Sequence, residues 1–431
     1  MAKIALLDKA GDLHSLAHRL AREGHEVRYW TRGSDKDPDL VKIGEGIVPR
    51  AKSRWHAVEG ADAVVLYGLP STAEQLREDG VPSWGSSRWA ADLEDDRAAA
   101  HALCEDHGIA CPEYHEFATA DEAKAFAQEH QDQAWVFKAE GNVAATTTHV
   151  CKTPKELLQV LESEGQNPEV KKFILEAVVE GVEVSTEGWF DYRQPGGWLL
   201  PFNSTIERKT FGAENIGPNV GCMGSLVWTW AGSSPRLVRQ VLLPITDVLR
   251  AERYVGPFDH NAIIAEDGTP YVLEPTPRLG WDAFEALGQM IPVGQLGEFL
   301  VALAQGRASS VPVAARFGAA VRLFMPIKSD AVRKVVPYPA VDIPDTPDVW
   351  LKDVFRDGET LRSTQTEPNL GFTIIGEATS AGDDAAACWQ HIYDTVIPSL
   401  TVDGLFYRPD LAQETIEDLQ ELFAMGYRIA G

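Results

Sequence analysis

One lysine and two glutamates stand near the ends of neighbouring strand patterns. Lys138 ends the apolar run "WVFKA" and is followed by a polar loop, and Glu176 and Glu183 lie on either side of a short turn at Gly181. Two carboxylates at this spacing can accept hydrogen bonds from an adenine amino group and from ribose hydroxyls, while the lysine faces phosphate. For Lys138 taken alone, the alternative is a solvated charge at a strand edge, because lysine is mostly a surface residue.

A hairpin pattern further along the chain carries oxygen ligands. Asn261 and Glu274 lie on two strand patterns joined by an Asp267-Gly268 step, which is typical of a hairpin turn and would bring the two side chains face to face. Thr276 follows Glu274 by two residues and therefore shares its strand face. Oxygen ligands of this kind suit Mg²⁺, or Mn²⁺ in its place, with phosphates and water completing the shell. The alternative is a solvated strand face with scattered polar residues.

The segment "TFGAENIGPNVGCMG", residues 210–224, is rich in glycine and includes Asn219 and Gly221. Glycines let backbone N–H groups approach ligand oxygens closely, because no Cβ stands in the way. The segment therefore favours close contact with a bound ligand. An ordinary surface loop is the alternative, since Gly, Pro and Asn dominate turns for conformational reasons alone.

Together these segments resemble the ATP-grasp ligases, and within them the glycinamide ribonucleotide synthetases, over essentially the whole chain. The most specific match is "GPNVGCMG", which is nearly that family's GPNTGGMG. The resemblance implies ATP and Mg²⁺ as cofactors and a lid over residues 141–149. It implies the following roles: phosphate contact and catalysis for Lys138, adenine contact for Glu176, ribose contact for Glu183, metal binding for Glu274, substrate or transition-state contact for Arg278, a catalytic role for Asn219, and nucleotide contact for Arg97 and Gly221.

The chain departs from the family pattern in two places near the nucleotide. In "GNVAATTTHV" the threonines, Thr147 and Thr148 among them, replace glycines and a lysine of the family's phosphate loop, which predicts a stiffer and less cationic loop. Threonine hydroxyls and backbone amides can still bind phosphate, so Thr147 and Thr148 are predicted phosphate contacts. Thr276 stands where the family has asparagine. On the acceptor side, "DKAGDLHSLAH", "YGLPST" and "WDAF" replace the family's motifs, so we expect a changed acceptor.

The predicted activity is that of an ATP-dependent, ADP-forming carboxylate–amine ligase. The substrate carboxylate would form an acyl phosphate, and an amine would then displace phosphate. We expect small-molecule carboxylate and amine partners from a specialised pathway. Two alternatives stay open: the phosphoribosylamine glycine ligase of purine synthesis, and a nucleotide-binding protein without turnover.

Composition argues against several other classes of function. The chain has 431 residues, 44% of them hydrophobic, and a formal net charge of −25, which argues against general nucleic-acid binding and against anionic membranes. The five cysteines are scattered and never form CxxC, so we expect free thiols and a cytoplasmic protein. No apolar run reaches the length of a membrane span. The oligomeric state is left open.

The elements that must position these residues follow an α/β and α+β order. Strand and helix patterns alternate at first, which predicts an open α/β sheet, and mixed order follows, which predicts the two lobes of an ATP-grasp fold. Continuous helices are predicted over residues 89–107, 234–253 and 283–304. The predicted domains are an N-terminal α/β (pre-ATP-grasp) domain over 1–112, a small lobe with the phosphate lid over 113–190, a large lobe with the metal site over 191–315, and a small C-terminal α/β domain over 316–431.

Overall fold

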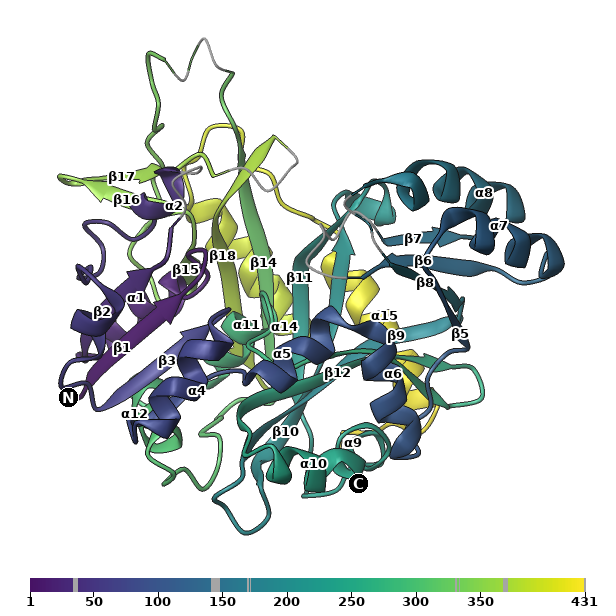
Figure 1. Cartoon of the computed structure of the whole chain (residues 1–431). Helices are drawn as coiled ribbons and strands as arrows, with labels where there is room; N and C mark the ends of the chain where they lie inside the picture. The colour runs from purple at the N-terminus through teal and green to yellow at the C-terminus, as the bar shows by residue number, and fades with distance from the viewer. Residues whose placement is uncertain are drawn as a thin grey trace.

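The structure is a computed structural model. It describes residues 1–33, 38–140, 148–168, 170, 172–329, 332, 334–366 and 371–429. Figure 1 shows three sheet-centred regions: an N-terminal sheet, a long central sheet, and a small lobe that stands apart on the other side. No helix in this part of the chain is long and apolar enough to cross a membrane.

The N-terminal region is a parallel sheet with strand order β2-β1-β3-β4. Its central strands are short apolar runs buried on both faces, as expected for a parallel sheet that helices cover. The elements are β1 (Lys3–Asp8), α1 (His14–Arg22), β2 (Glu26–Thr31), α2 (Pro38–Lys42), α3 (Arg54–Val58), β3 (Ala63–Tyr67), α4 (Pro70–Glu78) and β4 (Ser83–Trp84).

The small lobe is a four-stranded sheet of order β5-β8-β6-β7, with two helices packed against it. Alternate apolar residues of its strands form a separate core with those helices, so the lobe has its own packed interior. The elements are β5 (Tyr114–Phe117), α7 (Ala120–Glu129), β6 (Trp135–Ala139), β7 (Thr148–Cys151), α8 (Pro154–Ser163), η2 (Glu164–Gln166) and β8 (Phe173–Ala177).

The central sheet has eight antiparallel strands in the order β13-β12-β9-β10-β11-β14-β18-β15. Its strands are β9 (Gly181–Asp191), β10 (Trp198–Thr210), β11 (Asn219–Thr229), β12 (Val255–Ala265), β13 (Pro270–Thr276), β14 (Phe317–Pro326), β15 (Val349–Leu351) and β18 (Phe372–Gly382). Beside it lie the hairpin β16 (Val354–Asp357) and β17 (Thr360–Ser363).

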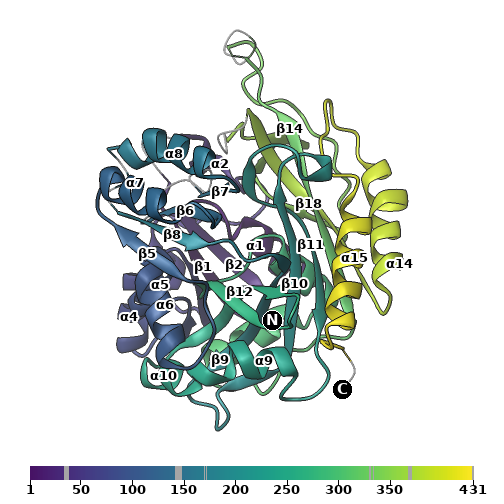
Figure 2. The ribbon, with the colours of Figure 1, turned by 90° about the vertical axis from the view of Figure 1, so that its right-hand side faces the viewer.

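Helices cover both faces of the central sheet. In Figure 2, α14 (Ala385–His391) and α15 (Leu411–Ala424) lie along one face, and the N-terminal strands lie on the opposite side. The remaining helical elements are α5 (Arg88–Asp95), α6 (Arg97–Asp106), η3 (Ala213–Asn215), α9 (Arg236–Val241), η4 (Leu243–Ile245), α10 (Thr246–Ala251), α11 (Ala283–Met290), α12 (Leu296–Ala304), η5 (Ile392–Val396) and η6 (Ile397–Ser399).

Each of the three long helices predicted from the sequence is broken. The first breaks at Asp96, whose backbone is extended and whose side chain accepts a hydrogen bond from the amide of Ala99 to cap α6. The other two break close to Pro244 and Pro292, because proline and the residue before it interrupt helical backbone. These predictions were wrong about continuity, and the breaks let each pair of short helices turn against the sheet.

Sheet pairing also bears on the predicted domain limits. β9 falls within the range predicted for the small lobe, yet it pairs with β10 and β12 of the central sheet. Likewise β14 pairs with β11, so the sheet continues without a break across residue 316. We therefore propose that the small lobe ends just before β9 and that the C-terminal segment extends the central sheet.

Candidate active site

A cavity of about 390 Å³ separates the small lobe from the central sheet, and we call it the interlobe cavity. Strands β6 and β8 contribute to it from the lobe, and β9, β10, β12 and β13 contribute from the sheet. The site residues predicted from the sequence that line this cavity are Arg97, Lys138, Thr148, Glu176, Glu183, Asn219, Gly221, Asn261, Glu274, Thr276 and Arg278.

Lys138 and Glu176 form a buried ion pair on the lobe side. The Lys138 Nζ to Glu176 Oε1 distance is 2.6 Å, and the two residues are 6% and 1% exposed. His101 of α6 lies 3.0 Å from the other carboxylate oxygen of Glu176. Burial alone would raise the pKa of Glu176, but Lys138 and His101 lower it, so the carboxylate is ionised. Glu176 therefore orients Lys138 as well as lining the cavity, which the sequence did not predict.

The hairpin forms with the predicted register. Asn261 pairs directly with Glu274, and the turn at Gly268 adopts a left-handed backbone. Arg97 donates a hydrogen bond of 2.6 Å to Glu274 Oε2. Burial alone would raise the pKa of Glu274, but Arg97 and nearby lysines lower it to about 2. Glu274 is thus an anion across the neutral pH range.

Glu183 is held by two neighbours. Lys209, the penultimate residue of β10, lies 2.6 Å from Glu183 Oε1, and Asn261 Nδ2 donates to the same oxygen at 2.8 Å. Burial would raise the pKa of Glu183, but these partners lower it. Lys209 lines the cavity and was missed from the sequence. Its place directly before the glycine-rich segment was the available signal.

Arg278 lies where the interlobe cavity meets the loop that precedes α11. Its Nε and Nη2 both donate to Glu94 Oε1, at 2.9 and 2.7 Å, so the guanidinium is fixed in position by α5. Its Cζ lies 5.8 Å from the centre of the Trp281 ring. The contact with Glu94 was not predicted, and it orients Arg278 at the border of the cavity.

The glycine-rich segment folds as part of β11 and packs on Trp281. Gly221 has a φ of +88°, and a Cβ built there would lie 2.5 Å from the Trp281 ring. A side chain at this position would therefore collide with the indole. Asn219 begins β11, where its Oδ1 accepts a hydrogen bond from Thr210 at 3.1 Å.

The predicted lid falls mostly outside the described residues. Thr147 belongs to that part, so the structure does not bear on its predicted phosphate contact. Thr148 is the first residue of β7 and pairs with Lys138 of β6. This pairing brings Thr148 to the same end of the lobe sheet as the buried lysine.

The charges of the interlobe cavity suit a polyphosphate that enters with a divalent cation. Its lining holds four cationic side chains and five carboxylates, so ATP alone would meet an excess of negative charge. Burial raises the pKa of Glu207 to about 7 with the help of neighbouring carboxylates, although Lys209 opposes this shift. Burial likewise raises the pKa of Asp259 to about 6. A bound cation would relieve this excess and favour the ionised forms.

The oxygen donors present fit Mg²⁺. Glu274 is ionised and only its Oε2 is taken by Arg97, and Asn261 presents its amide beside it. Thr276, two residues after Glu274 on the same strand, lines the same cavity. Within the described ranges, no group of three or more His, Cys, Asp or Glu side chains is arranged to hold a metal ion. Glu274, Asn261 and Thr276 would supply part of the shell, and phosphate oxygens and water would supply the rest.

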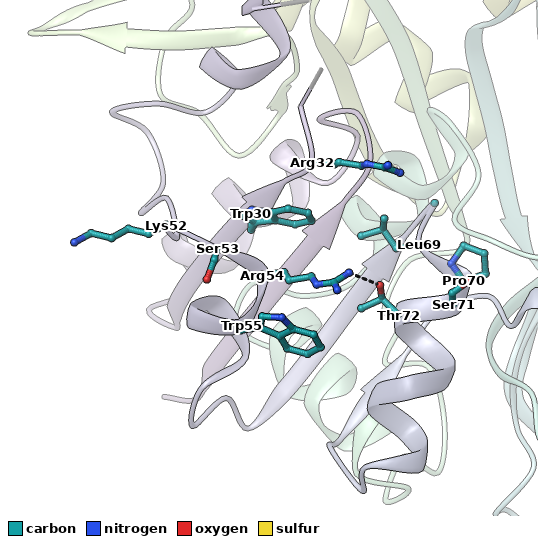
Figure 3. A pocket seen from close by; sticks show the side chains of 11 residues that line it. Trp30, Arg32, Lys52, Ser53, Arg54, Trp55, Leu69, Pro70, Ser71 and Thr72 are labelled. Carbon is teal, nitrogen blue, oxygen red and sulfur yellow. Dashed lines mark hydrogen bonds between the residues drawn. The ribbon is translucent and has the colours of Figure 1, made fainter. Parts of the chain in front are cut away.

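A larger cavity of about 640 Å³ lies on the N-terminal region (Figure 3). We call it the outer groove. The tryptophans Trp30 and Trp55 and the cations Arg32, Lys52 and Arg54 line it, and Arg54 donates a hydrogen bond to Thr72 at 3.3 Å. None of the predicted site residues lines the outer groove. Size alone therefore does not mark the active site, and the clustering of the predicted residues points to the interlobe cavity.

Comparison with known proteins agrees with this geometry. Residues 96–282 match the family described as "Phosphoribosylglycinamide synthetase, ATP-grasp (A) domain". The matched residues include the hairpin of β12 and β13 and all residues that line the interlobe cavity. Over these residues the chain is similar to an ATP-grasp domain.

Relatives of this chain match along most of its length. A phosphoribosylamine–glycine ligase of Rhizobium meliloti is 24% identical, with 96% of this chain and 99% of the relative covered. The crystal structure of phosphoribosylamine–glycine ligase from Thermotoga maritima has a TM-score of 0.70 at 19% identity, with 94% and 99% of the two chains covered. The predicted fold is thereby confirmed.

A second solved structure bears on the cofactors. The biotin carboxylase domain of 2-oxoglutarate carboxylase from Hydrogenobacter thermophilus, solved with MgADP, has a TM-score of 0.63 at 14% identity, with 100% of this chain and 96% of that chain covered. MgADP bound to that neighbour is the kind of ligand that the sequence predicts for this chain. The roles of individual site residues stay predictions.

Proposed function

We propose that this protein is an ATP-grasp carboxylate–amine ligase that forms an amide through an acyl phosphate and uses an amine other than phosphoribosylamine. The observation that carries the proposal is one cavity that combines Lys138 and Arg97 with the ionised Glu274 opposite Asn261. A lysine from the small lobe, with an arginine and oxygen donors at the hairpin, is a combination that suits a metal-bound triphosphate.

The proposed reaction has two steps. The substrate carboxylate attacks the γ-phosphorus of ATP, the bond to the β-phosphate oxygen breaks, and ADP leaves with that electron pair. A neutral amine then attacks the acyl carbon, and phosphate leaves as the C–N bond forms. Lys138 and Arg97 would neutralise phosphate oxygens, and Arg278 would stabilise the oxyanion that develops at the acyl carbon. Mg²⁺, when bound, would neutralise further phosphate charge.

The position of Arg278 supports this assignment. Its guanidinium is fixed by Glu94 and lies at the border between the interlobe cavity and a second cavity of about 230 Å³. Gly280 and Trp281 line both cavities. An acyl group activated in the first cavity would therefore meet an acceptor that enters through the second, with a fixed positive charge close to the reacting carbonyl.

The experiment supplies ATP, Mg²⁺ and pools of amino acids and other small carboxylates, with hydroxylamine as an artificial amine. Hydroxylamine traps an acyl phosphate as a hydroxamate, so no natural amine has to be known. We expect ADP and hydroxamate in equal amounts for at least one carboxylate, and neither product with Glu274→Gln. Arg54→Gln, a variant in the outer groove, is the control and should match the wild-type protein.

Two outcomes would decide between the alternatives. ATP binding without ADP or hydroxamate from any carboxylate would contradict the proposal and favour a nucleotide-binding protein without turnover. The second candidate, phosphoribosylamine–glycine ligase, is supported by the names of the relatives. Rapid ADP release with phosphoribosylamine and glycine, and with no other pair, would establish that candidate instead.

A further inference from the structure

The second cavity, which we call the acidic cavity, lies between the N-terminal region and the central sheet. The loop after β1, helix α1, helix α11 and strands β14 and β18 contribute to it. In Figure 1 the N-terminal strands and α1 lie beside β15 and β18, although these segments are more than 300 residues apart in sequence. The segments "DKAGDLHSLAH", "YGLPST" and "WDAF", where the sequence predicts a changed acceptor, all contribute residues to this cavity.

Buried charges at the acidic cavity do not balance. Asp282, Glu285 and Glu377 are 0–2% exposed, and only two cations, Arg322 and Lys352, lie among them. Arg322 Nε donates to Asp282 at 3.0 Å, and Lys352 donates to Glu285 and lies 3.1 Å from Glu377. Three buried carboxylates thus face two buried cations.

Groups on the surrounding elements do not supply the missing positive charge. Ser15 of α1 donates a hydrogen bond of 2.7 Å to Glu285. His14, its neighbour, is neutral, because burial lowers its pKa to about 3. Asp12 and Asp353 line the cavity as further acids, and Tyr67 contributes a phenol that accepts from Trp281. The charge of Arg278 also acts on Asp12 and Tyr67, but Arg278 is already paired with Glu94. With all of its acids ionised, the cavity would therefore carry a net negative charge.

Glu377 is the carboxyl group that this charge imbalance affects most. It is fully buried and shares a hydrogen bond with Asp282, and Lys352 Nζ lies 3.1 Å from its Oε1. Burial, together with the charges of Asp282 and Glu285, raises its pKa well above the usual range for a carboxyl. Glu377 therefore keeps a proton while the cavity is empty, and a cation that donates hydrogen bonds to these carboxyl groups would displace that proton.

The rest of the lining is apolar. Leucines, a phenylalanine and an isoleucine surround the charged floor, and Trp281 closes the side toward the interlobe cavity. Such a lining favours a small hydrocarbon body over a sugar. The apolar residues are Leu13, Leu16, Leu40, Leu279, Phe284 and Ile374.

From these observations we infer that the acidic cavity binds the amine substrate as an ammonium group on a small apolar body that carries no phosphate. The ammonium takes the place of the proton of Glu377 and donates hydrogen bonds to Glu377 and Asp282. Glu377 takes a proton back when the amine becomes neutral for its attack on the acyl carbon. A phosphate group would instead meet the excess negative charge. The inference rests on the proposed function, since it names the class of amine that this ligase uses.

The test measures binding of three probes by calorimetry, without ATP. n-Butylamine carries the ammonium and the apolar body, n-butanol lacks the charge, and O-phosphoethanolamine adds a phosphate. We expect n-butylamine to bind at least tenfold more tightly than the other two. Glu377→Gln should weaken n-butylamine binding at least tenfold, and Glu285→Gln serves as a second variant if the first does not fold. The cationic outer groove could bind the phosphate of O-phosphoethanolamine independently of the acidic cavity. The three titrations are therefore repeated with the outer-groove variant Lys52→Gln.

Equal or tighter binding of O-phosphoethanolamine in both backgrounds would overturn the inference. Unchanged n-butylamine binding in a folded Glu377→Gln protein, or no binding of n-butylamine at all, would also overturn it. These outcomes are separate from the hydroxamate assay, which needs no natural amine. A positive hydroxamate result with a phosphate-preferring cavity would reject this inference and keep the proposed function, and a negative hydroxamate result would reject the proposed function itself.

Discussion

Lys138→Met offers the sharpest test of the nucleotide site, because Lys138 has two separable tasks. It is predicted to contact phosphate, and it neutralises the buried Glu176 at 2.6 Å. Loss of a charge-assisted hydrogen bond to phosphate costs about 1–3 kcal/mol, which is roughly a 5- to 150-fold rise in the Kd for ATP. Removal of one partner from a buried ion pair costs a further 3–5 kcal/mol of folding stability. Because His101 stays 3.0 Å from Glu176, we expect about 3 kcal/mol.

A double variant separates the two tasks. In Lys138→Met/Glu176→Gln no buried carboxylate is left without a partner, so most of the lost stability should return. The affinity for ATP should stay low, since the positive charge is still missing. Urea unfolding measures the first quantity, and calorimetric titration with MgATP measures the second. The single variant Glu176→Gln shows the effect of the carboxylate by itself.

Two results would refute this reasoning. Wild-type ATP affinity in Lys138→Met would remove the lysine from the phosphate site. Recovery of ATP affinity in the double variant would mean that Lys138 acts only by neutralising Glu176. In that case the lysine would be a structural residue, and the phosphate contact would have to come from another cation such as Arg97 or Lys209.

Three further predictions follow from the same geometry. Glu274→Gln should reduce ADP release at least a hundredfold in a coupled assay while circular dichroism stays unchanged, and full activity would exclude Glu274 from the metal site. Gly221→Ala should lower the free energy of unfolding by about 2–4 kcal/mol, because the methyl group meets the Trp281 ring and the φ is left-handed, whereas Gly196→Ala, with open space around it, should have little effect. Burial alone would lower the pKa of His101, but Cys111 and Glu176 raise it to about 8. Protonated His101 therefore adds at most about 2 kcal/mol to the free energy of unfolding; this contribution is complete below pH 6.5 and is lost as the pH rises through 8. A pH series of urea midpoints would show this loss, and the same decline in His101→Asn would assign it to another group.

Local patterns in the sequence predicted the parts of the site that lie on one element or one hairpin. The Asp267-Gly268 turn, and with it the hairpin, is readable from the sequence. Asn261 faces Glu274 because a register shift between Asn261 and Ala262 displaces the pairing by one residue, and the sequence did not predict that shift. Lys138 and Glu176 were predicted as separate contacts with phosphate and adenine. Their ion pair was not predicted, because pairing of β6 with β8 is set by sheet topology and not by spacing along the chain.

Partners from distant segments could not be read from the sequence. Glu94 fixes Arg278 and His101 contacts Glu176 because the broken helices α5 and α6 fold back against the central sheet and the lobe. The acidic cavity joins α1 to β18 across nearly the whole chain. Such contacts follow from tertiary packing, which overrides local propensity, and a single sequence carries no direct signal for them.

The central claim is that a metal-bound triphosphate lies in the interlobe cavity, between Lys138 on one wall and Glu274 on the other. A crystal structure of the protein with Mg²⁺ and a non-hydrolysable ATP analogue tests it most directly. The account predicts phosphate density within hydrogen-bonding distance of Lys138 Nζ and a cation bound to Glu274. Nucleotide density in the outer groove beside Trp55, with the interlobe cavity empty, would contradict it.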